Sequence, residues 1–427
     1  MDTKLKSIGL IWPKSTFLSR TDVFPPLGLW YISNRLKSMG YKTEFFDLNF
    51  NEMPNDEFDY LFVGGTSPQI REVRKIAEIT KNWKAKRILG GAGAWASPES
   101  HKNLGYDLVV GGEADDPNNM KFIFDYIESP PKDKYILLPI SKTLDWVLPP
   151  DRTWANKYYA YMDDLISGER YRMATMYNTR GCVMRCSFCE VGRDGVIFGK
   201  RVRYESNEII EEQIQELSKL GFHGIAYYDD VADFDKRKML QKMEMHKKYG
   251  MKFRCFLRSD FTIKHGGREY LKQLRDGGLI EVFVGIESAD NNIKNAINKD
   301  TTIEMDNAVL EWCRELGIKF KGAFILGLPF ESMESMQRTR EWILKQNPNG
   351  IRIQVGRLIP FSGTPLGDHP EKFDLNYEHQ PDENWFYSGD NGINTRSFVS
   401  TSHLTVDEID IFWRNLLLDM DRAGIIS

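Results

Sequence analysis

Three cysteines lie within eight residues of one another in the stretch NTRGCVMRCSFCE, residues 178–190. They are Cys182, Cys186 and Cys189, with the spacing C-x3-C-x2-C. A structural zinc site needs four ligands in a closed tetrahedron, and the next histidine along the chain is His223, beyond a predicted helix. Iron–sulfur clusters are held by thiolates, and three thiolates would leave one iron of a [4Fe-4S] cluster open, as in a catalytic site. The spacing therefore favours an iron–sulfur centre over a zinc site or three unrelated buried cysteines.

The other two cysteines are predicted to be structural. Cys255 alternates with Arg254 and Phe256 on a predicted strand, so it should point away from the polar face, under the helices. Cys313 lies in a helical pattern beside apolar neighbours. Both should behave as small buried hydrophobes.

The overall composition is that of a globular protein, with 41% hydrophobic and 28% charged residues and a net charge of −4. This charge gives no sign of a surface that coats nucleic acid. No run reaches the roughly 18 apolar residues that a membrane span needs. Five cysteines in 427 residues, three of them clustered, do not make a disulfide framework. We therefore expect a cytoplasmic monomer in a reducing compartment.

Residues 1–135 are predicted to form a doubly wound, parallel α/β domain. Short apolar segments that end in glycine alternate with helical patterns, which is typical of an open parallel sheet. Ligands of such sheets lie outside the carboxyl ends of the strands. The candidate binding residues at those ends are Thr66, Ser67, Gly90, Gly91, Gly111, Gly112 and Glu113. The alternative is that these glycines simply end strands and begin helices.

A second alternating series follows a break. Paired prolines flank and interrupt residues 136–168, which predicts an extended linker. Six strand–helix units over residues 169–370 predict a partial (β/α)6 barrel, and residues 371–427 form a small C-terminal extension. Chemistry in barrels lies at the carboxyl ends of strands. The polar residues predicted there are Asp229, Asp230, Arg258, Asp260, Glu287, Ser288 and Glu331.

These motifs, in their order, resemble the branch of the radical S-adenosylmethionine superfamily that carries a cobalamin (B12)-binding domain. The barrel motifs are C-x3-C-x-F-C, YYDD, FLRSD, VFVGIESAD, AFILGLPFES and RLIPFSGTPL. The first domain contributes PPLGLWYISNRLKSMGY, VGGTS, ILGGAGAWAS and VVGGEAD, so the resemblance covers residues 6–370. Ala323 and Phe330 stand where the family often has glycine, and Ser362 where it often has proline.

The resemblance implies a cofactor set and a reaction. S-adenosylmethionine would chelate the open iron, and one electron, from a donor such as flavodoxin or ferredoxin, would cleave it to methionine and a 5′-deoxyadenosyl radical. Phe188 would lie against the adenine, and Asp229 or Asp230 would bind the amino group. Arg258 would bind the carboxylate, and Glu287, with Ser288 beside it, would contact the nucleoside. For each of these, the alternative is a strand-end residue that caps a neighbouring helix.

Cobalamin is the third cofactor implied, with one departure from the family pattern. The motif D-x-H-x-x-G, which offers a histidine to cobalt, is absent, and His101 is the only histidine of the first domain. Two interpretations stay open. The domain binds cobalamin without a histidine ligand, or it keeps the fold and has lost the cofactor.

The resemblance implies a methyltransferase that methylates an unactivated carbon of a small-molecule or peptide substrate. A radical rearrangement or cyclisation, with or without cobalamin, is the second hypothesis. A non-catalytic iron–sulfur or cobalamin-binding regulator is the third. The C-terminal aromatics, among them Tyr377, Phe398 and Trp413, either close the barrel against substrate or serve packing alone.

Overall fold

The computed structural model describes residues 6–129, 133–191, 201–378 and 397–425. Within these ranges the chain forms two compact units, which divide between Tyr158 and Tyr159. Trp385, Phe386 and Tyr387, three further aromatic residues of the C-terminal region, lie outside the described residues. None of the helices in the described ranges combines the length and the apolar composition that a membrane span requires.

The first unit is built on a sheet with the strand order β2-β1-β3-β4-β5-β6, and every neighbouring pair is parallel. The strands are β1 (Ser7–Trp12), β2 (Lys42–Asp47), β3 (Tyr60–Val63), β4 (Lys86–Leu89), β5 (Leu108–Gly111) and β6 (Tyr135–Leu137). The helices are α1 (Leu27–Ser38), η1 (Ser67–Gln69), α2 (Ile70–Thr80), α3 (Ala92–Ala96), α4 (Pro98–His101) and α5 (Pro117–Glu128). The predicted doubly wound parallel sheet is confirmed.

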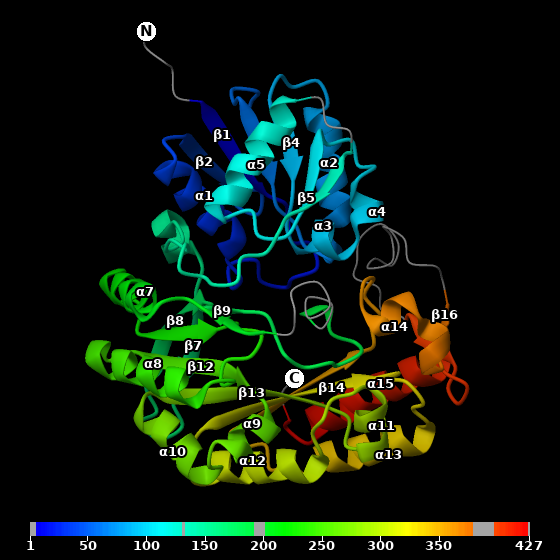
Figure 1. The fold of residues 1–427 in the computed structure, drawn as a ribbon. Helices are drawn as coiled ribbons and strands as arrows, with labels where there is room; N and C mark the ends of the chain where they lie inside the picture. Colours follow the sequence, from blue (N-terminus) through cyan, green and yellow to red (C-terminus); the bar gives the residue numbers. More distant parts are fainter. Residues whose placement is uncertain (1–5, 130–132, 192–200, 379–396, 426–427) are drawn as a thin grey trace. The chain divides into compact units, whose positions relative to one another are not determined.

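Helices cover both faces of this sheet (Figure 1). On one face, Val73 and Ile76 of α2 pack with Leu61 and Val63 of β3 in a buried cluster. On the other face, Phe124 of α5 makes ring contacts with residues of β3. Successive residues of β3 therefore pack on opposite faces of the sheet, as the two-residue period of a strand requires.

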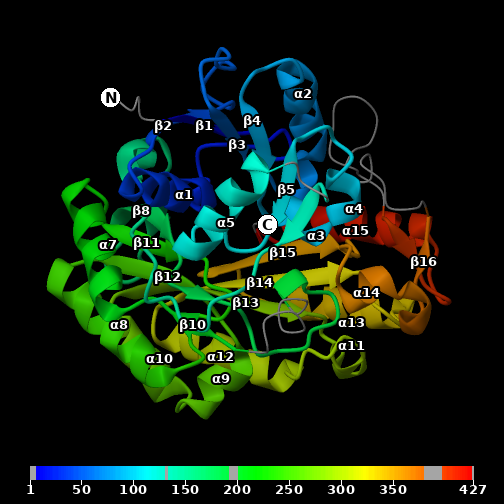
Figure 2. The same ribbon diagram turned by 45° about the horizontal axis from the view of Figure 1, so that its top comes forward.

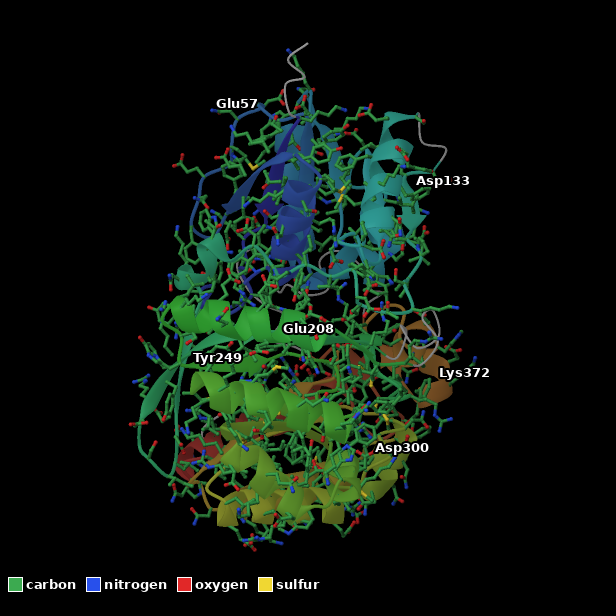
Figure 3. The ribbon with its side chains drawn as sticks, turned by 60° about the vertical axis from the view of Figure 1, so that its left-hand side comes forward. Glu57, Asp133, Glu208, Tyr249, Asp300 and Lys372 are labelled. Carbon is green, nitrogen blue, oxygen red and sulfur yellow. The ribbon has the colours of Figure 1, made fainter. Side chains whose placement is uncertain are left out.

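The carboxyl ends of β1 and β3 mark the point where the strand order reverses. In open α/β sheets, this is where ligands bind. Glu57 and Asp133, labelled in Figure 3, precede β3 and β6 and so mark the opposite, amino-terminal edge.

The second unit contains a half-barrel with the strand order β15-β14-β13-β12-β11-β8-β7. Its six parallel strands are β8 (Arg170–Met176), β11 (Gly224–Tyr227), β12 (Lys252–Leu257), β13 (Leu279–Glu287), β14 (Lys319–Leu326) and β15 (Ile351–Arg357). The helices that connect them are α7 (Asn207–Lys219), α8 (Lys236–Tyr249), α9 (Ser259–Lys264), α10 (Arg268–Asp276), α11 (Asn291–Ala296), α12 (Ile303–Glu315) and α13 (Met333–Leu344). The predicted partial (β/α)6 barrel is confirmed.

The barrel helices lie along one face of the sheet, as Figures 1 and 2 both show. Phe253 of β12 meets His246 of α8, and Phe324 of β14 meets Trp342 of α13. Cys255 has the same strand parity as Phe253 and is 1% exposed, and Cys313 is fully buried in α12. The structural burial predicted for these two cysteines is confirmed.

The segment predicted as an extended linker contains ordered structure instead. Beyond β6 it includes η2 (Arg152–Lys157) and strand β7 (Ala160–Asp163), which pairs antiparallel with β8. Asp151 accepts a hydrogen bond from Ser33 of α1 at 2.8 Å, so the proline-rich stretch is anchored to the first unit. Asp164, at the β7–β8 turn, forms a buried ion pair with Arg275. Pro149 and Pro150 therefore lie in a packed connection and not in a free linker, because the neighbouring Asp151 makes a hydrogen bond to the first unit.

The C-terminal extension packs against the edge of the half-barrel. It consists of α14 (Pro365–Asp368), η3 (Pro370–Phe373), a short pair β16 (Asn376–Tyr377) and β17 (Val399–Ser400), and helix α15 (Val406–Arg422). Trp413 of α15 donates its indole N–H to the carbonyl of Val355 at 2.9 Å, and Asp410 pairs with Arg357 at 2.7 Å. The helix thus covers the edge of β15, where unpaired backbone groups would otherwise be open to other chains.

Candidate active site

The cysteine loop follows β8 at the carboxyl end of the half-barrel. It begins at the short strand β9 (Thr179–Arg180), which pairs with β10 (Arg203–Tyr204). Ser187, between the second and third cysteines, donates its backbone N–H to the carbonyl of Ile297 at 3.0 Å. Its own carbonyl accepts from the N–H of Leu366 at 3.1 Å. The loop is therefore held by backbone bonds from two distant segments.

All three thiols border one cavity, together with Phe188, Asp230, Arg258 and Glu287. Burial raises the pKa of the Cys182 thiol, so the thiol keeps its proton until a metal displaces it. Among the described residues, no three His, Cys, Asp or Glu side chains converge closely enough to hold a single metal ion. A multi-iron cluster requires less convergence, because each thiolate binds a different iron atom.

Arg258 comes directly after β12 and reaches toward the second cysteine. Its Nη1 lies 3.8 Å from Sγ of Cys186. Its Nε and Nη2 donate to Asp260 at 3.0 and 3.2 Å, and Nη2 also donates to the carbonyl of Lys299 at 2.6 Å. Two fixed partners hold the guanidinium beside the cysteine loop and leave its positive charge facing a thiol.

Asp229 is engaged with the backbone. One carboxylate oxygen accepts the N–H groups of Asn178 and Thr179 at 2.7 and 2.8 Å, and the other lies 3.6 Å from Nζ of Lys242. The side chain is buried. These contacts match the structural alternative for this residue, since they fix the chain that leads into the cysteine loop.

Asp230 faces the cavity more openly. It accepts the N–H of Gly181 at 2.8 Å, one residue before Cys182. Its side chain is exposed on the open side of the cavity, and desolvation by the neighbouring protein atoms raises the pKa of the carboxyl to about 6. The charged form is therefore disfavoured until a cation or a hydrogen-bond donor approaches.

Asp233 also borders the cavity, and sequence reasoning did not single it out. It is fully buried, and neither carboxyl oxygen has a hydrogen-bond partner in the described structure. Burial raises the pKa of this carboxyl to about 7. A buried carboxyl without partners is costly, so Asp233 is prepared for a donor or a cation that enters the cavity.

Glu287 and Lys299 form a buried ion pair at 2.7 Å on the cavity wall. Glu287 ends β13 at a register shift and has a φ of 68°, which is uncommon for a residue other than glycine. Lys299, which sequence reasoning also missed, precedes Asp300 (labelled in Figure 3) on the loop before α12. Its Nζ lies 6.0 Å from the centre of the Phe188 ring.

Ser288, beside Glu287, is fully buried and accepts the N–H of Asp290 at 3.1 Å through its hydroxyl. It does not border the cavity in the part of the chain described. The structure therefore gives Ser288 the turn-capping contact that was the alternative to cofactor binding.

In the first unit, Thr66 and Ser67 lie at the carboxyl end of β3. The backbone N–H and hydroxyl of Thr66 donate to Oε1 of Gln69 at 2.9 and 3.0 Å. The Gln69 amide in turn donates to the carbonyl of Pro13 after β1 at 2.9 Å. Gln69, which the sequence did not mark, thus ties the two strand ends together at the point where the strand order reverses.

We call the row of carboxyl strand ends in the first unit the rim. The glycines of this rim serve different purposes. A β-carbon at Gly91 would lie 2.6 Å from the carbonyl of Gly65, and one at Gly111 would lie 2.3 Å from the Tyr135 hydroxyl. Gly112 has a φ of 103° and faces Leu138. At Gly90, by contrast, the nearest atom would be 3.7 Å away. Of the glycines predicted as candidate binding residues, Gly91 and Gly111 therefore face other parts of the protein, whereas Gly90 faces open space.

The remaining polar candidates of the first unit are buried. Glu113 is 8% exposed, and its carbonyl accepts from the Asn119 amide at 2.9 Å. His101 is 2% exposed, lies 2.8 Å from the carbonyl of Ser97, and has a pKa that burial lowers. His101 is therefore packed into the core of the unit.

Comparisons with known proteins agree with this geometry. The model of the radical SAM superfamily matches residues 176–343. The hopanoid C-2 methylase of Rhodopseudomonas palustris is 25% identical over 362 residues, which span 82% of this chain and 64% of the relative.

Two solved structures share the fold across 98% of the chain. The radical S-adenosylmethionine methyltransferase TsrM from Kitasatospora setae, determined with cobalamin and a [4Fe-4S] cluster, has a TM-score of 0.67 at 14% identity over 89% of its length. The cobalamin-dependent S-adenosylmethionine radical enzyme OxsB, with aqua-cobalamin and S-adenosylmethionine bound, has a TM-score of 0.72 at 15% identity over 67% of its length. The resemblance predicted from the motifs is confirmed.

Proposed function

We propose that this chain is a methyltransferase of the radical SAM superfamily, in the branch with a cobalamin-binding domain, and that it uses a [4Fe-4S] cluster, S-adenosylmethionine and cobalamin. The observation that carries the proposal is one cavity bordered by three thiols, a guanidinium and several acids. The hopanoid methylase and TsrM, which the chain resembles, are both named for methyl transfer. A non-catalytic regulator would have no need of charged groups around the cysteines.

The cysteine loop fits an iron–sulfur cluster. Cys182, Cys186 and Cys189 offer thiol ligands from one loop, and thiolates are the ligands that such clusters take. Arg258, 3.8 Å from Cys186, supplies positive charge beside the thiolates. With three cysteine ligands from this loop, one iron of a [4Fe-4S] cluster would keep a coordination position for a further group.

The cavity also fits an amino-acid sulfonium such as S-adenosylmethionine. Asp233 would bind the ammonium group, since both of its buried oxygens lack partners. Asp230, which also borders the cavity, would add a second acceptor for the same group. Arg258 would bind the carboxylate, and Phe188 would lie against the adenine.

The rim of the first unit fits a flat cofactor at one place. Gly90 is the strand-end glycine whose surroundings leave room, and Thr66 and Ser67 follow the next strand. His101 is packed in the core, so cobalamin would bind without this histidine on cobalt.

When bound, the cluster and S-adenosylmethionine supply a 5′-deoxyadenosyl radical, and cobalamin supplies the methyl group. The residues of the chain bind, orient and shield these groups. Glu287, held by Lys299, would orient the nucleoside. Phe256 and Phe283, which also border the cavity, would keep water away from the reacting carbon.

The decisive experiment is anaerobic turnover of the reconstituted chain. With dithionite, hydroxocobalamin and methyl-labelled S-adenosylmethionine, the protein should form 5′-deoxyadenosine and load the label onto cobalamin. Alanine at Cys182, Cys186 or Cys189 should abolish iron binding and both products. Cys255→Ala, which removes a buried thiol away from the cavity, is the matched control and should keep the cluster.

Two results would change the proposal. Formation of 5′-deoxyadenosine without any labelled methylcobalamin would favour a radical rearrangement or cyclisation. Absence of 5′-deoxyadenosine from protein with about four irons per chain would favour the regulator.

A further inference from the structure

Two basic residues, Lys321 of β14 and Arg352 of β15, lie side by side on the half-barrel; we call them the basic pair. The parallel register places Lys321 directly opposite Arg352. On the other side of Lys321, the same row continues with Phe283 of β13 and Phe256 of β12. Residues that pair across parallel strands share a face of the sheet.

This face is the one that the helices leave uncovered. Phe253 and Phe324, which have the opposite strand parity, contact helices α8 and α13. Phe256 and Phe283 contact each other with ring centres 4.6 Å apart. Nζ of Lys321 lies 5.0 Å from the centre of the Phe283 ring. The basic pair therefore belongs to the concave, interior face.

Other positive charges near this row have acidic partners. Arg254, one layer lower, pairs with Glu281 at 3.1 Å and also donates to the Tyr228 hydroxyl. Lys319, in the same lower layer, lies 3.6 Å from Asp163.

The basic pair has no such partner. In the described ranges, the side chains of Lys321 and Arg352 make no hydrogen bond and no ion pair. Burial and the charge of Arg254 lower the pKa of Lys321; the carboxylate of Glu281 opposes them in part, and the charge of Arg352 lowers the pKa further. Two like charges on neighbouring strands destabilise a sheet, so the arrangement is unfavourable unless an anion compensates it.

The pair is adjacent to the cysteine cavity. Phe256 and Phe283 border that cavity and belong to the same row as Lys321. Gln354, one layer above Arg352, is exposed and adds a neutral amide. A molecule that extended from the cavity across the two rings would reach the basic pair.

We propose that the substrate carries an oxyanion, a carboxylate or a phosphate ester, which Lys321 and Arg352 bind on the interior face of the half-barrel. Arginine provides two parallel donors for such a group, and lysine adds a point charge. The reacting carbon then lies over Phe256 and Phe283. This inference rests on the proposed radical function, because it assigns one end of that enzyme's substrate.

The test measures oxyanion binding to the full-length chain by calorimetry, at constant ionic strength. The probes are inorganic pyrophosphate and succinate, which separate phosphate from carboxylate recognition. The double variant Lys321→Met/Arg352→Gln removes both charges and keeps the Cβ and Cγ methylene groups of each side chain. The control Arg268→Gln/Lys272→Met removes two charges from exposed ion pairs on α10, on the helix side.

At least one probe should bind the wild type and the control saturably and bind the double variant tenfold or more weakly. Equal binding to all three proteins, or no saturable binding of either probe, would overturn the inference. Without probe, the thermal midpoint of the double variant should equal or exceed that of the wild type, because repulsion is removed. A fall of several degrees would instead assign the pair a structural role.

The two proposals fail separately. Probe binding requires neither the cluster nor cleavage of S-adenosylmethionine, so it is measured on the same preparation that is assayed for 5′-deoxyadenosine. Radical formation without probe binding would overturn only the oxyanion site, and loss of radical formation would overturn the proposed function.

Discussion

Gly285, Glu287 and Lys299 determine one another's placement on the cavity wall. A β-carbon at Gly285 would lie 2.3 Å from Oε1 of Glu287 and 2.8 Å from Nζ of Lys299. Glu287 adopts a left-handed backbone conformation, which is unfavourable for a residue with a side chain and occurs often at functional sites. The ion pair with Lys299 holds the Glu287 side chain in this conformation on the cavity wall.

Lys299→Met should therefore strongly destabilise the chain before any cofactor is added. It leaves a buried carboxylate without its cation, and breaking such pairs costs about 3–5 kcal/mol. The double variant Glu287→Gln/Lys299→Met should lose less than the sum of the two single variants, because the uncompensated charge is gone. Urea unfolding of the apo protein measures the free energy of unfolding of Lys299→Met, Glu287→Gln and the double variant.

The control for this cycle is Lys272→Met, which removes a cation from an exposed helix pair with Asp276. It should leave the urea midpoint unchanged. Additive effects of the Glu287 and Lys299 substitutions would show that the two side chains do not interact in solution.

The site residues that sequence could predict were those with a local signal. The three cysteines follow from spacing alone, and Arg258 and Glu287 follow from their places at strand ends. Lys299 and Asp233 carry no such mark. Asp233 acquires its raised pKa from burial, to which a distant segment contributes: Nε2 of His265 lies 2.6 Å from the backbone carbonyl of Asp233. Contacts between distant segments decide such residues, and no short stretch of sequence encodes them.

Glu331 shows how one side chain organises the end of a strand. Its Oε2 accepts the N–H groups of Gly327 and Leu328 after β14, at 2.6 and 3.2 Å. Its carbonyl accepts the Thr401 hydroxyl at 3.1 Å, which ties the turn to the C-terminal extension. The side chain is fully buried, Oε1 has no hydrogen-bond partner among the described residues, and burial raises the pKa of the carboxyl to about 8.

This pKa predicts that stability falls as the pH rises. The folded chain keeps the proton up to about pH 8, whereas the unfolded chain loses it near 4.5. Between those values the folded state binds more protons, so the free energy of unfolding decreases with pH, by roughly 1.4 kcal/mol per pH unit at most. Glu331→Gln should remove this slope, match the wild type at pH 5 and exceed it at pH 8.5.

Urea unfolding at several pH values, under reducing conditions, measures the slope. Glu334→Gln, which neutralises an exposed carboxylate on α13 paired with Arg338, is the control and should retain the wild-type slope. An unchanged slope in Glu331→Gln would mean that this carboxyl is ionised in the folded chain at neutral pH.

The elements themselves were predictable where a periodic pattern was present. Ser206 stands directly before an amphipathic pattern and begins α7, where its hydroxyl accepts the N–H of Ile209 at 3.3 Å. Strands β6 and β7 were missed, because they are only three and four residues long. Strand β7 exists only through its antiparallel partner β8, and such pairing depends on the fold as a whole.

The whole chain contains two units, each with its own core and its own row of strand ends. The first has the rim around Gly90 and Thr66, and the second has the cysteine cavity. Since each set of candidate residues belongs to one unit, loading of cobalamin and loading of the iron–sulfur cluster should be separable by single substitutions.

Gly90→Leu and Cys186→Ala should therefore have opposite effects on the two cofactors. Gly90→Leu places a side chain in the open space of the rim, whose nearest protein atom is 3.7 Å from a β-carbon. It should lower retention of hydroxocobalamin after desalting at least tenfold and keep the iron content. Cys186→Ala should lose iron and keep cobalamin. Gly111→Ala is the control for folding, because its β-carbon would meet Tyr135 at 2.3 Å, so it should lower the thermal midpoint with or without cobalamin.

If wild-type protein with a native circular dichroism spectrum retains no cobalamin, the first unit has kept the fold and lost the cofactor. Methyl transfer through cobalt would then be excluded, and radical chemistry at the cysteine cavity alone would remain.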